Sequence, residues 1–117
     1  MGKIASWETI LARTDIVGGD IASYEGNATF RGPISKIQMI EDMIKVEMEW
    51  TAKLVMGKWV KNETRTVLAI VYYSMPAVID EGRIYFPIPG IGLAVIIPKG
   101  GSKLNPKKVK GLVLKTN

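Results

Sequence analysis

Residues 43–55 read MIKVEMEWTAKLV, and apolar and polar side chains alternate along almost the whole run. The apolar set shares one side, and its members are Ile44, Val46, Met48, Trp50, Ala52 and Leu54. A period of two is typical of a β-strand with one buried face, because successive side chains point to opposite sides of a sheet. This run therefore predicts an all-β fold with a strand over residues 43–55.

The segments on either side of this run predict an antiparallel meander over residues 27–73. Its parts are a strand over about 28–40, a turn at Glu41-Asp42, the run 43–55, a tight hairpin at 55–58 and a strand over 59–73. The first strand contains the pair Gly32-Pro33, which predicts a bulge or a bend, because proline cannot donate to a ladder and glycine weakens one.

The length of these strands narrows the architecture. A straight strand of 13 residues spans roughly 43 Å at about 3.3 Å per residue, whereas strands are usually about 5–6 residues long. Two neighbouring strands of this length must bend and serve both sides of a wrapped sheet. The geometry predicts a small, strongly bent antiparallel β-barrel of the SH3-like or Sm-like kind.

The rest of the chain adds a short helix and shorter strands to a single domain of residues 1–117. Four apolar side chains at helical spacing, together with Ser6 as a capping residue, predict a helix over residues 6–13. They are Ile4, Trp7, Ile10 and Leu11. Turn residues separate further strands expected near 21–24 and, within 83–114, over 83–86, 93–97 and 109–114.

The composition argues against an enzyme. The chain contains no cysteine and no histidine, which removes disulfides, thiolate metal sites and the commonest general base. Glu47 and Glu49 share one strand face, but flanking lysines favour cross-strand charge pairing over acid–base catalysis. Asp15 and Asp20 flank a Gly-Gly turn without the spacing of a calcium-binding loop. We expect a non-enzymatic protein with no metal and no cofactor.

The formal net charge of +5 is concentrated at the C-terminal end. Residues 99–117 hold six lysines and no acidic residue, whereas the preceding residues hold ten basic and eleven acidic groups. Unopposed lysines attract phosphates, so this segment is a candidate nucleic-acid or anion-binding site, with Trp59 and Tyr73 as stacking faces. Lysines also simply keep tails and edges soluble. The candidate residues are Lys58, Lys61, Arg65, Lys99, Lys103, Lys107, Lys108 and Lys110.

A second candidate contact site is the apolar loop at residues 87–92, which is rich in proline and glycine. If exposed, it would contact a subunit or another partner; if packed, it is an ordinary barrel loop. The side chains concerned are Pro87, Ile88, Pro89 and Ile91.

These patterns support three functional hypotheses. The first is a small structural or interaction module that forms a homo-oligomer, because catalytic side chains are missing and edge strands invite pairing between subunits. The second is a nucleic-acid-binding module that uses the lysine-rich C-terminal segment. The third is a barrel that holds a small apolar ligand, lined by Met39, Met48, Trp50, Leu68 and Ile70.

The sequence predicts neither a transmembrane segment nor a signal peptide. The longest apolar run, residues 84–98, has 15 residues and is interrupted by proline and glycine, whereas a helical span needs about 20. The first 14 residues contain no continuous apolar stretch after a basic start. We expect a cytoplasmic or virion-associated protein.

Overall fold

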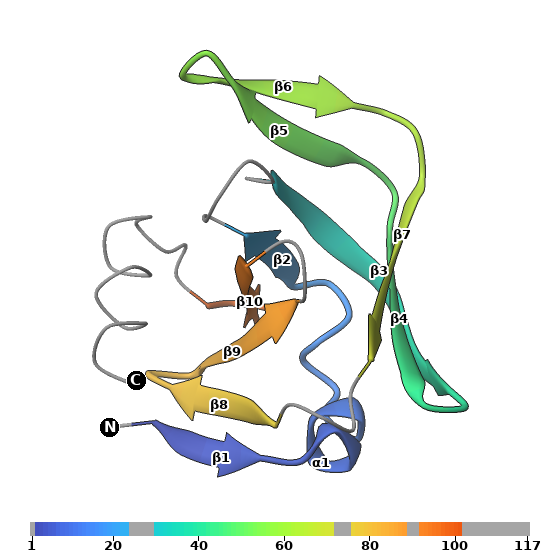
Figure 1. The fold of residues 1–117 in the computed structure, drawn as a ribbon, viewed down its shortest axis with the longest axis vertical. Coiled ribbons are helices and arrows are strands. Elements are labelled where there is room, and N and C mark those ends of the chain that lie inside the picture. Colours follow the sequence, from blue (N-terminus) through green and yellow to red (C-terminus); the bar gives the residue numbers. More distant parts are fainter. Residues whose placement is uncertain (1, 24–29, 72–75, 89–91, 102–117) are drawn as a thin grey trace.

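The computed structural model describes residues 2–23, 30–71, 76–88 and 92–101, which form a mainly antiparallel β structure with one short helix, α1 (Trp7–Leu11). The all-β prediction is confirmed, and the strand predicted at 109–114 lies outside the described residues. The strands in Figure 1 are β1 (Lys3–Ala5), β2 (Asp20–Ser23), β3 (Phe30–Ile40), β4 (Met43–Met48), β5 (Thr51–Val55), β6 (Lys58–Asn62), β7 (Thr66–Val71), β8 (Ala77–Asp80), β9 (Arg83–Ile88) and β10 (Gly92–Ile97).

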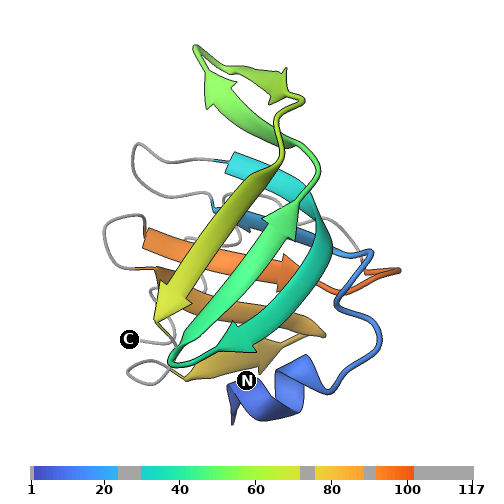
Figure 2. The same cartoon turned by 90° about the vertical axis from the view of Figure 1, so that its right-hand side faces the viewer.

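The strands form one sheet that curls around the core without closing (Figures 1 and 2). Its order is β1-β8-β9-β10-β2-β3-β4-β7, and β5 joins β3 to β6 beside this path. The terminal strands of the path, β1 and β7, do not pair with each other in the described part of the chain. The bent antiparallel sheet is therefore observed and the predicted closure is not; a relation to SH3-like or Sm-like barrels stays a prediction.

The run at residues 43–55 is divided into two strands that bend away from each other. It follows one edge of β3 throughout, first as β4 and then as β5, with a break at Glu49-Trp50. The next segment is divided at the same level, so that β6 pairs with β5 and β7 pairs with β4. The segments 43–55 and 58–71 therefore bend at the same level, and this bend sets the pair β5 and β6 apart from the rest of the sheet.

Gly32 permits the close approach on which this bend depends. A Cβ atom at position 32 would lie 2.6 Å from the carbonyl oxygen of Trp50 and 2.8 Å from the sulfur of Met48. Any larger residue would push β3 away from the break between β4 and β5, because the backbone oxygen cannot rotate aside.

A bulge accompanies the bend. The register between β3 and β4 shifts between Ile34 and Lys36, which leaves Ser35 outside the regular pairing. The Ser35 hydroxyl donates a hydrogen bond to the carbonyl oxygen of Glu47 at 3.0 Å. The irregularity that the sequence predicts near Gly32-Pro33 is thus a bulge at Ser35, whose hydroxyl bonds to the facing strand.

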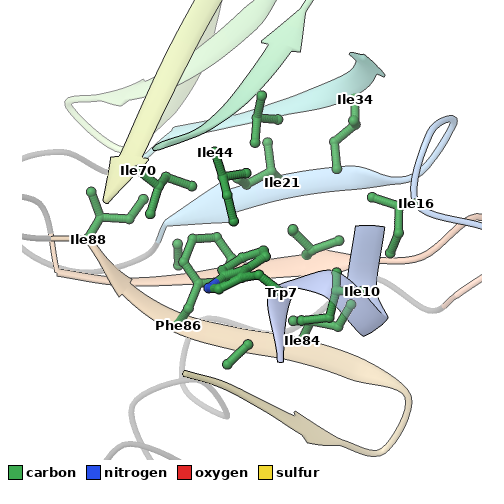
Figure 3. Packing of buried hydrophobic residues seen from close by; sticks show 14 of the residues in the cluster. Trp7, Ile10, Ile16, Ile21, Ile34, Ile44, Ile70, Ile84, Phe86 and Ile88 are labelled. Atoms are coloured by element: carbon green, nitrogen blue, oxygen red, sulfur yellow. The ribbon is translucent and has the colours of Figure 1, made fainter. Parts of the chain in front are cut away.

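The main hydrophobic core draws on α1 and on strands from both ends of the sheet path, as Figure 3 shows. Trp7 meets Phe86 edge to face, with the ring centroids 5.0 Å apart. Ser6 caps α1 as predicted, because its hydroxyl accepts a hydrogen bond from the amide of Thr9 at 3.3 Å. The helix is shorter than the predicted 6–13, because it ends at Leu11 with Ala12 as its C-terminal cap. Ile4, which the helical spacing included, lies instead in β1 and pairs with β8.

Within the described residues, no helix has both the length and the apolar character needed to cross a membrane.

Candidate functional site

The hairpin of β5 and β6 projects from the body of the domain, and we refer to residues 51–62 as the arm (Figures 1 and 2). It is attached through β5, which in the described part of the chain pairs with β3 at Phe30 and Arg31. Thr51 and Ala52 at its base are buried, whereas every residue from 53 to 62 is exposed. The arm is therefore a two-stranded element with little support from the core.

The tip of the arm is a two-residue turn, as the sequence predicts for residues 55–58. Both turn residues have positive φ angles, 50° at Met56 and 80° at Gly57, and Val55 pairs with Lys58 across the turn. Such turns match the right-handed twist of the flanking strands. They also present their side chains to solvent, and Met56 is 98 % exposed.

The arm carries most of the exposed large apolar side chains of the described residues. Of nine such side chains, five lie on the arm, whereas the remaining four are distributed over other elements. The five are Leu54, Val55, Met56, Trp59 and Val60. Scattered apolar residues are normal on a protein surface, but a concentration on one projecting element makes that element a candidate contact site.

Aromatic and basic side chains meet at the base of the arm. The guanidinium of Arg31 lies 5.0 Å from the ring centroid of Trp59, and the ammonium of Lys61 lies 4.6 Å from that of Trp50. The segment from residue 50 to residue 62 also contains three lysines and no acidic residue. The arm therefore combines exposed apolar groups with positive charge and with two cation–π pairs.

The structure separates the residues of the predicted basic site. Lys58 and Lys61 both lie on β6, and the ammonium of Lys61 forms an exposed ion pair with Glu63 at 3.3 Å. Arg65 instead forms an ion pair with Glu47 at 2.6 Å, which compensates its charge. Lys99 follows β10, where its amide donates to the carbonyl oxygen of Asp15 at 2.6 Å, and Figure 2 shows this end of β10 far below the arm. Four further candidates lie outside the described residues: Lys103, Lys107, Lys108 and Lys110.

Two of the four carboxylates considered from the sequence, Glu47 and Asp15, have side-chain partners within the fold. Glu47 binds Arg65, as described above. Asp15 accepts two hydrogen bonds from Arg13, at 2.9 and 2.6 Å, and these bonds hold the pKa of the Asp15 carboxyl below its ordinary value. The described residues contain no group of three or more potential ligands that could hold a metal ion.

The described half of the predicted contact loop is packed. Pro87 and Ile88 extend β9 beyond the predicted end of that strand, and Ile88 belongs to the main core. Pro89 and Ile91 lie outside the described residues.

The residues expected to line a ligand cavity are also engaged elsewhere. Met48 and Ile70 are buried in the core, and Met39 and Leu68 pack against it. Trp50 lies beside Lys61 at the base of the arm.

The arm itself is the feature that the sequence analysis missed. Leu54 continues the alternation of the run at 43–55 and was therefore assigned to the buried face, but it is exposed. Among the described residues β3 begins at Phe30, which pairs with Lys53, so no described residue of β3 lies beside the run beyond that point. The dipeptide Met56-Gly57 at the tip indicates the hairpin in the sequence. No pattern there reveals that the hairpin projects from the rest of the sheet.

Comparisons with protein-family models, with curated proteins and with solved structures find no match to this chain.

Proposed function

We propose that this chain is a non-enzymatic β domain that acts by assembly, as a homo-oligomeric structural or interaction module whose contact element is the arm. The observation that carries the proposal is the concentration of five exposed large apolar side chains on one projecting hairpin. A two-stranded hairpin is marginally stable alone in water, so an arm of this kind gains most when another surface covers it.

The gain from covering the arm is of the same order as the free energy of unfolding of a small domain, which is about 5–15 kcal/mol. Full burial of one large apolar side chain contributes about 1.5–3 kcal/mol, and scaling this by the exposed fractions of the five gives about 4–8 kcal/mol. The costs of association reduce this value, because translation, rotation and side-chain freedom are lost. Only the part of this value that exceeds those costs stabilises the assembly.

The fold supports the same proposal. The sheet curls as a small barrel does but leaves β1, β6 and β7 as edges among the described residues. We include in the proposal that the domain is an open relative of SH3-like and Sm-like barrels, in which subunits complete each other's sheets. Edges of this kind are the usual sites of strand addition.

Sedimentation velocity over a wide range of concentrations tests the proposal. We expect a species larger than the 12.9-kDa chain, with a population that grows with concentration. A chain that sediments as a strict monomer at the highest concentration would contradict assembly.

Nucleic-acid binding through the lysine-rich C-terminal segment is the second candidate, to which the arm adds Lys61 over the ring of Trp50 and Arg31 over the ring of Trp59. Basic grooves with aromatic faces bind single strands with little sequence preference. Fluorescence anisotropy with a labelled oligonucleotide should show binding that weakens steeply as salt rises, and removal of residues 103–117 should abolish it. Binding that is insensitive to salt, or equal in the truncated chain, rules this candidate out.

A further inference from the structure

β6 is an open edge of the sheet, and its position makes it accessible to a second chain. In the described part of the structure it pairs with β5 alone, and β5 separates it from β3. Figure 1 shows β6 as the outermost strand, with the body of the domain on the side of β5. A strand added to β6 would therefore not collide with the body.

The hairpin geometry determines which backbone groups of β6 are free. A two-residue turn is closed by a hydrogen-bonded pair, here Val55 and Lys58, and such pairs alternate along an antiparallel ladder. Val60 and Asn62 consequently direct their backbone groups toward β5. Trp59 and Lys61 direct theirs outward, to the open edge.

This alternation leaves three registers for two antiparallel copies of β6, since outward-directed residues must face each other. Either Trp59 faces Trp59, or Trp59 faces Lys61, or Lys61 faces Lys61. The last register opposes like charges, and the first and last each overlap only three of the five strand residues. The middle register overlaps all five.

The middle register also matches the side chains. It places Lys58 opposite Asn62, Trp59 opposite Lys61 and Val60 opposite Val60 of the second copy. Lys61 beside an indole repeats the kind of contact that it already makes with Trp50, at 4.6 Å. In this register no lysine faces a lysine. In the last of the three registers Lys61 faces Lys61 of the second copy.

We propose that two copies of this chain pair through β6 across a twofold axis, with Val60 at the axis. The three strands β3, β5 and β6 of each copy then form one continuous sheet. This inference rests on the proposed assembly and names its contact. The alternative edge is β7, where Val67 is exposed, and it is an outcome of the test.

Cysteine cross-linking tests this register directly, because the chain contains no cysteine of its own. In the proposed pair Val60 occupies a non-hydrogen-bonded site, where opposing Cα atoms lie about 4.5 Å apart, within the range of a disulfide. The test variant is Val60→Cys. The matched control is Val67→Cys, since both valines lie on edge strands and are 52 % and 53 % exposed.

Under mild oxidation we expect Val60→Cys to form a reducible covalent dimer at least about tenfold faster than Val67→Cys, because pairing raises the effective concentration of the facing thiol. Equal rates, or faster cross-linking of Val67→Cys, would overturn the proposed contact. If the unmodified chain is oligomeric while Val60→Cys stays unreactive, only this contact fails. A monomeric unmodified chain removes both the contact and the proposed function.

A proline substitution provides the second test. Lys61→Pro removes an outward amide without removing a hydrogen bond to β5, and proline is tolerated at such edge sites. Lys61→Ala is the control, since it loses the same side chain and keeps the amide. We expect Lys61→Pro to sediment as a monomer and Lys61→Ala as the oligomer, with unchanged circular dichroism for both; an oligomeric Lys61→Pro contradicts the proposal.

Discussion

Replacing Gly32 by alanine tests the bend that separates the arm from the body. The added methyl group meets the carbonyl oxygen of Trp50 at 2.6 Å and the sulfur of Met48 at 2.8 Å. The φ angle of Gly32 is not positive, so the cost arises from this contact and not from the backbone conformation. Overpacking of this kind costs about 1–3 kcal/mol, and the immobile carbonyl places Gly32→Ala in the upper half of that range.

Thermal unfolding followed by circular dichroism measures this effect. For a domain of this size about 1 kcal/mol corresponds to roughly 4 °C, so Gly32→Ala should lower Tm by about 8–12 °C. Gly82→Ala is the control, because no atom lies within 4 Å of its Cβ position and only its φ of 77° opposes the change. For Gly82→Ala we expect a cost of about 1–2 kcal/mol. A Tm of Gly32→Ala within 2 °C of the parent chain, or a smaller loss of stability than in Gly82→Ala, would refute the role of this contact.

Three further predictions concern the body of the domain. Phe86→Ala removes the partner of Trp7 and should lower the free energy of unfolding in urea by about 3–5 kcal/mol; a loss below about 1 kcal/mol contradicts the described core. Ser6→Ala removes the helix cap and should cost about 1 kcal/mol in the same assay, so an unchanged midpoint argues against the cap. Asp15→Asn should lower Tm slightly at neutral pH, and the difference should vanish as the pH falls through the lowered pKa of Asp15, because the ion pair stabilises only the ionised carboxylate. A difference that persists at pH 2 contradicts this assignment.

The alternation of residues 43–55 predicted the strand correctly where a second strand lies beside it. Ile44, Val46 and Met48 are buried as the pattern requires, because the main hydrophobic core covers that face of β4. Leu54 obeys the same pattern and is exposed, since periodicity reports which side chains share a face and not whether anything covers that face. The length of the predicted strands was sufficient to predict a bend. The direction of the bend depends on contacts around Gly32 with residues distant in sequence, which the pattern does not show.

Short elements escaped prediction for a related reason. β1 and β8 have three and four residues, too few to show a period, and they are defined by pairing with each other. At the candidate site, Lys58, which the sequence placed in the hairpin turn, lies with Lys61 on β6. Arg65 instead forms an ion pair with Glu47, and the sequence does not reveal this pair because the two residues are distant along the chain.

The role of the arm in assembly is tested most directly by sedimentation velocity of two charge variants. Val60→Glu places a carboxylate opposite Lys53 within the hairpin, and Val67→Lys places an ammonium opposite Glu47, so each new charge meets an opposite charge in its own chain. Only Val60→Glu would also bring two carboxylates together between copies. We predict that the parent chain and Val67→Lys sediment as the oligomer and that Val60→Glu sediments as a 12.9-kDa monomer. An oligomeric Val60→Glu, or a monomeric parent chain, would contradict the account.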